Sequence, residues 1–254
     1  MMTEHTVLDL VGRYFEDGIG RHDLSALADV LHPRYIFHGA GLTVTGRDDR
    51  YLPMVKDYLD RQPDVGTRVH DVIFSGEYVA VHLTKTITDP PAAWRTILVY
   101  RGVPGGRLSE CWYEQDWAAY RGQIRGEIPV PPVAAALPDP WHTAAGEPDE
   151  CTDSAARRWI EARPGDDPSD GGSVLDVESV SIDCLVTAGP RFAFHLTRRG
   201  TYLGGIHRHG SSIGMPVSLV EAGVGTVADG EVVSAVTVAD HESVRQQLRS
   251  GARR

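Results

Sequence analysis

In the N-terminal part of the chain, apolar side chains recur every three or four positions, which is the spacing of helices that bury one face. Residues 5–17 follow this spacing, and so do residues 21–33, where Asp23 has the position of an N-cap and Pro33 ends the pattern. The short segment "RYIFHG" that follows predicts a strand. A third helix is predicted for 46–63, because one proline lies near its first turn and another just past its end.

After the third helix the period of the apolar positions changes to two, which is typical of strands. Glycine and proline turns separate the strand candidates, with Gly76, Asp89-Pro90-Pro91 and Gly105-Gly106 at the turns. The predicted strands are 68–75, 77–88, 93–102 and 107–117. Helices collected before an antiparallel meander indicate an α+β fold rather than alternating α/β.

Residues 126–150 differ from both flanking regions, since they are rich in proline and have almost no periodicity. Such a composition predicts a semi-extended linker between two domains, 1–125 and 151–254. Trp141 is unusual in a free linker, so we expect this part of it to lie against a domain.

The second half of the chain repeats features of the first. "AVHLTK" at 80–85 matches "AFHLTR" at 193–198, and a glycine precedes an aspartate by the same interval in Gly106 to Asp116 and in Gly230 to Asp240. The shared order of these features indicates a duplication. Equivalents of the second and third helices are missing from the second copy, which is therefore expected to be a reduced version of the first.

Composition excludes several classes of function. A formal net charge of −10, with basic residues scattered along the chain, argues against nucleic-acid binding. No segment is apolar enough to cross a membrane, and the N-terminus lacks the features of a secretory signal, so we expect a cytoplasmic protein. The three cysteines, Cys111, Cys151 and Cys184, fit neither a disulfide framework nor a zinc site. His207 and His209 lack a nearby third ligand and are more typical of a polar loop than of a metal site.

Three segments carry a resemblance to a known family: "LADVLHPRYIFHG", "GRDDRYLPMV" and "GGRLSECWYEQDW". They resemble the SnoaL-like polyketide cyclases, which share the fold of nuclear transport factor 2 and ketosteroid isomerase. This resemblance implies a cone-shaped α+β barrel in which helices cover a curved antiparallel sheet, present here in two tandem copies. It also implies a small, largely apolar ligand, and no motif in the sequence indicates a cofactor.

The last predicted strand of the first copy carries the leading catalytic candidate. Because side chains alternate between faces, Trp112, Glu114 and Asp116 share one face of this strand. The resemblance implies that Asp116 points into the cone and acts as the catalytic acid or base, with Trp112 as a pocket wall. A carboxylate among aromatic side chains is desolvated, which raises its pKa. The alternative is an aspartate at the sheet rim, free in water.

His38 is the second catalytic candidate, because a histidine can donate a hydrogen bond to a developing enolate oxygen; the alternative is a core histidine bonded to backbone. His82 and His195 occupy matching positions in the two copies, which favours a structural role. The residues that we expect to bind substrate are Trp112, Glu114, Tyr35, Tyr51, His82 and Trp94.

Together these observations predict a cofactor-independent cyclase or isomerase that acts on a polyketide-like or other apolar, carbonyl-bearing small molecule through aspartate acid/base catalysis. Two alternatives remain open. One is a non-catalytic binding protein for a hydrophobic metabolite, and the other is an epoxide-opening cyclase or hydrolase, for which Arg95 and Asp116 would supply part of the site. The second copy is expected to act as an internal partner of the first, and a homodimer is a further possibility.

Overall fold

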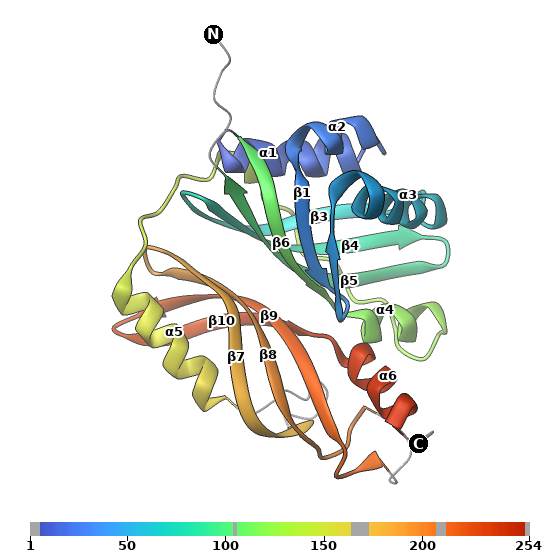
Figure 1. The fold of residues 1–254 in the computed structure, drawn as a ribbon, viewed down its shortest axis with the longest axis vertical. Helices are drawn as coiled ribbons and strands as arrows, with labels where there is room; N and C mark the ends of the chain where they lie inside the picture. The colour runs from blue at the N-terminus through green and yellow to red at the C-terminus, as the bar shows by residue number, and fades with distance from the viewer. Residues whose placement is uncertain (1–5, 104–105, 164–172, 207–211, 252–254) are drawn as a thin grey trace.

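The computed structural model describes residues 6–103, 106–163, 173–206 and 212–251. Figure 1 shows two sheets that lie one above the other, with α1, α2 and α3 on the side of the first sheet that faces away from the second. The predicted α+β fold, with two tandem sheets and fewer helices in the second copy, is confirmed.

The first half of the chain forms a six-stranded sheet in the order β2-β1-β6-β5-β4-β3. The sequence analysis missed β2 and the parallel pairing of β1 with β6, which adds β1 and β2 to the sheet beyond β6. The helices are α1 (Val7–Arg13), α2 (Leu24–Val30) and α3 (Leu52–Arg61), with π-helical segments at Tyr14–Ile19 and Arg47–Tyr51. The strands are β1 (Leu31–Gly39), β2 (Leu42–Thr45), β3 (Gly66–Ser75), β4 (Tyr78–Thr88), β5 (Pro91–Val103) and β6 (Arg107–Gln115).

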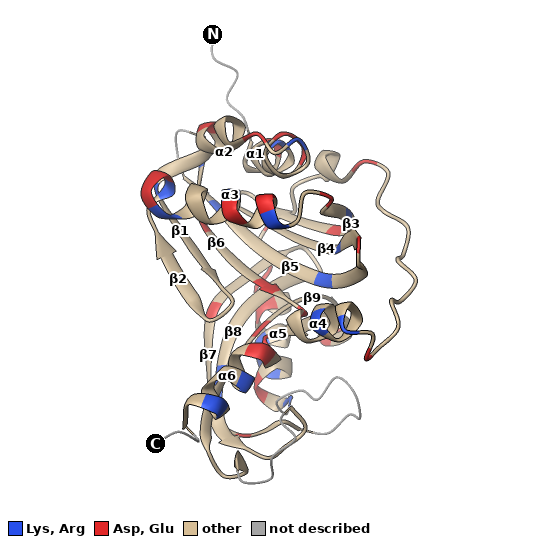
Figure 2. Cartoon of the chain, turned by 90° about the vertical axis from the view of Figure 1, so that its right-hand side faces the viewer, with Lys and Arg blue, Asp and Glu red and all other residues tan. Residues whose placement is uncertain are grey.

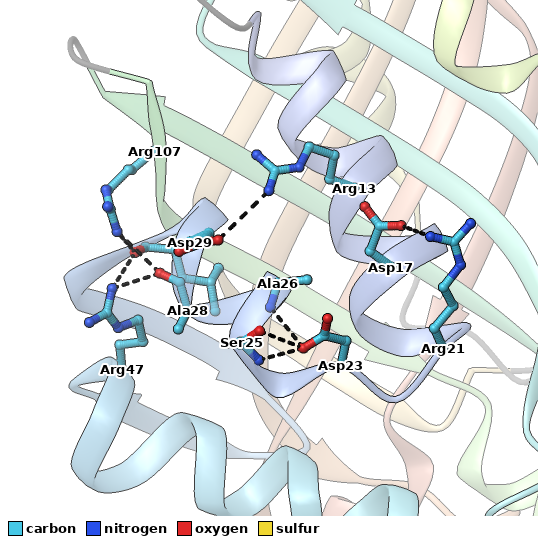
Figure 3. Close-up of polar contacts among 11 residues, drawn as sticks. Arg13, Asp17, Arg21, Asp23, Ser25, Ala26, Ala28, Asp29, Arg47 and Arg107 are labelled. Carbon is cyan, nitrogen blue, oxygen red and sulfur yellow. Dashed lines mark hydrogen bonds and ion pairs between the residues drawn. The ribbon is translucent and has the colours of Figure 1, made fainter.

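Both ends of α2 are fixed by side chains, as Figure 3 shows. Asp23 caps its N-terminus as predicted, since its carboxylate accepts hydrogen bonds from the backbone N–H groups of Ser25 and Ala26. At the other end, Arg47 and Arg107 donate to the backbone oxygen of Ala28 at 2.7 and 3.1 Å. These bonds satisfy helix-end carbonyl groups and allow the chain to pass directly from α2 into β1.

The last strand of the first half is shorter than predicted. It ends at Gln115, and a further helix that the sequence analysis missed, α4 (Trp117–Ile124), follows at once. Asp116 is the N-cap of this helix, and its carboxylate accepts a hydrogen bond of 2.8 Å from the backbone N–H of Ala119. The position predicted to be the catalytic end of a strand is therefore the start of a helix.

The second half begins with one helix and continues with a four-stranded antiparallel sheet in the order β10-β9-β8-β7. A C-terminal helix then packs against the end of this sheet, near α4 (Figure 1). The elements are α5 (Glu150–Ala162), β7 (Leu175–Ala188), β8 (Arg191–Tyr202), β9 (Pro216–Ala228), β10 (Glu231–Ala239) and α6 (His241–Gly251).

Strand register supports the duplication in detail. In the first sheet His82 pairs with Ile97, which pairs with Glu114. In the second sheet His195 pairs with Ala222, which pairs with Val238. Each position of the first ladder thus has an equivalent in the second, so that His82 corresponds to His195 and Glu114 to Val238.

The two sheets pack face to face through a shared apolar cluster. It contains Ile97, Val99 and Trp112 from the first sheet and Ala193 and Val224 from the second. Polar contacts surround it, among them an ion pair of 2.5 Å between Arg121 on α4 and Glu242 on α6. An ion pair between Arg191 and Asp71 joins the opposite side.

The segment between the halves has no strand, and its one short helical turn is Pro140–His142. Trp141 stacks on Phe15 with a ring-centroid distance of 5.5 Å, which confirms that this part of the segment lies against the first half. No helix in the described ranges combines the length and apolar character that a membrane span requires. Lys and Arg residues are spread over many elements instead of gathering on one (Figure 2).

Candidate active site

The first half encloses a cavity of about 300 Å³ between the sheet and the helices that cover it. Aromatic and aliphatic side chains supply most of its wall. Those contributed by the helical layer include Tyr14, Tyr51, Met54, Val55 and Tyr58, and those contributed by the sheet include Phe37, Leu98, Tyr100, Cys111 and Tyr113. A cavity of this size and character suits a small apolar molecule.

Lys85 is the one lysine in this wall, and its side chain is only 8% exposed. It lies on β4 in the row Val79, Val81, Leu83 and Lys85, whose side chains all point to the helix-covered side of the sheet. Its ammonium nitrogen donates to the hydroxyl oxygens of Tyr113 at 2.9 Å and Tyr58 at 3.2 Å. The nitrogen also lies over both tyrosine rings, so its surroundings are aromatic rather than acidic.

Burial lowers the pKa of Lys85 to about 7, because a charged amine loses its hydration and gains no carboxylate partner. Burial has the opposite effect on the tyrosines beside it. The pKa values of Tyr58 and Tyr113 are raised, so both hydroxyls remain protonated donors at neutral pH. The site therefore combines a titratable amine with two neutral hydroxyl groups.

A second polar pair lies in the same wall. The hydroxyl oxygens of Tyr14 and Tyr51 are 2.6 Å apart and buried. Burial raises the pKa of Tyr14 to about 12 and also raises the pKa of the nearby Cys111 thiol, so neither group ionises near neutral pH. These groups can orient a ligand through hydrogen bonds, but they do not supply a base.

The prediction that Trp112 and Glu114 face the interior of the cone is wrong. Cys111, Tyr113 and Gln115 line the cavity, whereas Trp112 belongs to the cluster between the two sheets. Glu114 lies on the same outer face as Trp112. Because the second sheet covers that face, both sides of β6 are buried, and the hydrophobic pattern alone could not distinguish inside from outside.

Asp116 does not line the cavity, and its carboxylate caps α4 instead. Its counterpart Asp240 precedes α6 in the same way, and the backbone N–H of Ser243 donates to it at 3.0 Å. Helix capping thus explains why both copies have an aspartate at this position.

The remaining predicted residues lie in different places. Of these, Tyr51 lines the cavity as expected. Tyr35 is buried behind it, with the two rings 4.7 Å apart. The indole of Trp94 is buried and donates to Gln115 at 2.7 Å, so it supports a lining residue from outside the wall.

The two histidine candidates lie on the outer face of the sheet. The ring of His82 is 5.3 Å from that of His70, and burial, with smaller contributions from the charges of Arg95 and His70, lowers its pKa to about 4. His38 stacks on Trp112 and bonds to Glu110 at 2.9 Å. His38, Trp112 and Glu114 do come together, but they line a different cavity, which lies between the two halves.

The sequence analysis did not select Lys85, although one signal pointed to it. The chain contains only two lysines, and Lys85 falls on the apolar side of a strand whose other residues on that side are Val79, Val81, Leu83 and Ile87. A charged residue within such a row is a candidate for function, because burying an unpaired charge is costly.

Among the residues that the structure describes, no group of three histidine, cysteine or acidic side chains is arranged to hold a metal ion. His207 and His209 lie outside the described residues.

Comparison with known proteins identifies the first half. Residues 11–111 match the family model of the SnoaL-like domain, and no curated protein matches the chain. Among solved structures, IdmH from Streptomyces antibioticus, a proposed polyketide cyclase, is 20% identical with a TM-score of 0.43 and covers 48% of this chain and 99% of that one. A proposed SnoaL-like polyketide cyclase from Jannaschia is 16% identical with a TM-score of 0.42, covering 52% of this chain and 99% of that one. The family-model match over residues 11–111 agrees with the resemblance to SnoaL-like proteins that the sequence predicted.

Proposed function

We propose that the cavity of the first half binds a largely apolar small molecule with a carbonyl group, and that Lys85 removes a proton from the carbon beside that carbonyl. A SnoaL-like domain supports a cyclase-like, isomerase-like or ligand-binding function. The observation that carries the proposal is the buried amine of Lys85 in an aromatic wall, with a pKa of about 7. A general base is most effective when its pKa lies near the working pH.

The contacts of Lys85 divide the chemistry between three side chains. The unprotonated amine can still donate to Tyr58 and Tyr113 through its two N–H bonds, which leaves its lone pair for the substrate proton. Each tyrosine oxygen accepts from the amine and keeps its own proton, which it can donate to the substrate oxygen. The two hydroxyls would stabilise the negative charge that develops on this oxygen as the enolate forms.

Ring closure follows without a cofactor. The enolate carbon attacks a second carbonyl group of the same molecule, a carbon–carbon bond forms, and the new alkoxide takes back the proton from the Lys85 ammonium. Atoms and charge balance, so the product is an isomer of the substrate. The aromatic wall would contribute by folding the substrate so that its two reacting carbons meet.

The epoxide-opening alternative has less support, because no Asp or Glu occurs among the described residues that line this cavity. Simple binding without chemistry is the stronger competitor, because the wall is apolar apart from a few groups.

A proton-exchange experiment separates binding from catalysis without knowledge of the natural substrate. The probe is 2-tetralone, an apolar bicyclic ketone, and NMR follows the exchange of its α protons for deuterium in D2O. We expect the wild-type protein to accelerate exchange at least ~10²-fold more than Lys85→Met. The rate should rise with pH through about 7, as the amine loses its proton, and then level off.

Lys56→Met is the matched control, because the other lysine lies on the exposed side of α3, where it pairs with Asp60. This variant should exchange the probe at the wild-type rate. Equal rates in the wild type and Lys85→Met would disprove the catalytic role of Lys85, and binding of 2-tetralone without exchange would favour the binding protein.

A further inference from the structure

A second cavity of about 290 Å³ lies between the two halves of the chain, on the face of the first sheet opposite to Lys85. Both halves contribute to its wall. The first half supplies His38, Trp112 and Glu114, and the second supplies Asp183, His195 and Thr197.

Glu114 has the features of a ligand-binding group. Its side chain is 1% exposed, and one carboxylate oxygen, Oε1, lies 3.4 Å from Nε2 of His195. The other oxygen, Oε2, is buried and has no hydrogen-bond partner among the described residues. A buried carboxylate oxygen without a donor costs free energy, so a ligand that supplies the donor would gain from the contact.

The histidine next to Glu114 is held by a second carboxylate. Nδ1 of His195 lies 3.0 Å from Asp183, so the imidazole bridges two acids, one from each half. Burial alone would lower the pKa of His195, but the bonds to Asp183 and Glu114 raise it. The cavity wall thus contains two carboxylates and one imidazole, whose single positive charge can compensate only one of them.

The electrostatic surroundings of Glu114 are consequently negative. Its pKa is raised to about 7, first by burial and then, against the effect of His195, by the charges of Asp240 and Asp183. The other titratable groups near the cavity are His38 and its partner Glu110, which Arg101 approaches at 3.9 Å. Counted with Asp240, four carboxyl groups (Glu114, Asp183, Glu110 and Asp240) thus lie near two imidazoles and one guanidinium, so a positively charged ligand would find more acid than base here.

An aromatic surface completes the wall. The ring of His38 stacks on Trp112 with centroids 5.7 Å apart and planes at 14°. His38 is fixed from both sides, by Glu110 at 2.9 Å and Thr43 at 3.2 Å. An indole beside a carboxylate is a favourable environment for an organic cation, because the ring face attracts positive charge.

We propose that this cavity is a second ligand site, built jointly by the two halves, for a small organic cation whose N–H donors pair with the carboxylate of Glu114. An ammonium or amidinium group on an apolar or aromatic body fits both the acids and the Trp112 wall. This proposal is independent of the reaction assigned to Lys85, which lies on the other face of the sheet.

The duplication explains why such a site is built once. The position equivalent to Glu114 is Val238, and the position equivalent to His195 is His82, whose pKa is lowered rather than raised. Among the described residues, this ladder position therefore brings a buried carboxylate against an acid-paired imidazole where β6 of the first half faces β8 of the second.

Benzylamine and its uncharged analogue benzyl alcohol test the proposal, with binding measured by calorimetry and by the indole N–H signal of Trp112 in NMR spectra. We expect benzylamine to bind the wild-type protein at least ~10-fold more tightly than benzyl alcohol, and Glu114→Gln to remove that preference. Glu178→Gln, an exposed acid-to-amide change on β7, should bind benzylamine as the wild type does.

A second variant avoids dependence on one buried substitution. Val220→Phe places a larger side chain in the cavity wall and should abolish benzylamine binding while Glu114 remains. Saturating 2-tetralone should not displace benzylamine, because Lys85 and Glu114 lie on opposite faces of the first sheet. Equal benzylamine affinity in the wild type, Glu114→Gln and Val220→Phe, or no binding to the wild type, would overturn the proposal.

Discussion

The same strand position carries a buried cation in both halves of the molecule, but the two cations have different surroundings. Lys85 ends the segment "AVHLTK" on β4, and Arg198 ends "AFHLTR" on β8. Arg198 is fully buried and pairs with Glu221 at 3.0 Å, and it also donates to the backbone oxygens of Ile160 and Arg163. Lys85 contacts two tyrosine hydroxyls and an open cavity. Arg198 is thus paired with an acid and with backbone groups, whereas the amine of Lys85 faces the cavity in which we propose catalysis.

Side-chain volume changes in parallel with charge. Leu98 and Tyr100 line the cavity of the first half, and the equivalent positions on β9 are Gly223 and Gly225. There, the rings of Phe194 and Phe192 cover the glycines and pack against α5. The helix and the phenylalanines fill, in the second half, the space that the first half leaves for a ligand.

Removing the buried cation of the second half should have the largest effect on stability. Arg198→Met leaves Glu221 buried with only part of its charge compensation, and we expect a loss of about 3–5 kcal/mol in the free energy of unfolding. Chemical denaturation measures it. A loss below ~1 kcal/mol would show that Arg163, which also pairs with Glu221, compensates the buried charge of Glu221 without Arg198.

The equivalent change in the first half should act in the opposite direction. Since the pKa of Lys85 is about 7 in the folded chain and 10.5 in the unfolded chain, the unfolded state binds more protons between these values. Burial of Lys85 therefore lowers the free energy of unfolding, and this reduction is complete below pH 7. The reduction becomes smaller as the pH rises towards 10.5.

We accordingly expect Lys85→Met to be more stable than the wild type at pH 6, and we expect this advantage to shrink by about 4 kcal/mol between pH 6 and pH 10, because each pKa unit corresponds to about 1.4 kcal/mol. Denaturation curves at both pH values give the difference, with Lys56→Met as the reference for loss of a surface lysine. A difference that does not change with pH would contradict the lowered pKa.

Larger side chains at Gly223 of the second half and at its equivalent Leu98 of the first half should have different effects on stability, because only the first half has a cavity there. A β-carbon at Gly223 would lie 2.3 Å from the ring of Phe194, so Gly223→Ala should cost about 1–3 kcal/mol. The equivalent residue of the first half borders open space, so Leu98→Phe should cost less while reducing the affinity for 2-tetralone. Thermal unfolding and the binding measurement together test the contrast.

The smallest expected effects concern the aspartates that the two halves share. Asp116→Ala and Asp240→Ala each remove an N-cap, with an expected loss of about 1 kcal/mol. Asp116→Ala should leave the exchange of 2-tetralone unchanged. Loss of exchange in a folded Asp116→Ala protein would show that Asp116 is needed for catalysis and would contradict its assignment as a helix cap alone.

The sequence by itself determined most helices and strands of the first half, and it indicated the duplication. Helices and strands were predicted from the spacing of apolar residues, and the duplication from the matched segments "AVHLTK" and "AFHLTR". Both signals depend only on the order of residues along the chain. The N-cap Asp23 was equally local. The sequence also contained the signal for Lys85, which is a lysine within a row of apolar residues. Only the cavity beside it indicated that this lysine could contact a ligand.

Only the tertiary structure decided which face of each strand is inside. Period two places Tyr113 and Glu114 on opposite faces, but it does not say which face meets the helices and which meets the other sheet. Because both faces of β6 are covered, both are buried, and the choice depends on contacts between residues far apart in the chain, such as Glu114 with His195. Those contacts separate the cavity around Lys85 from the cavity around Glu114.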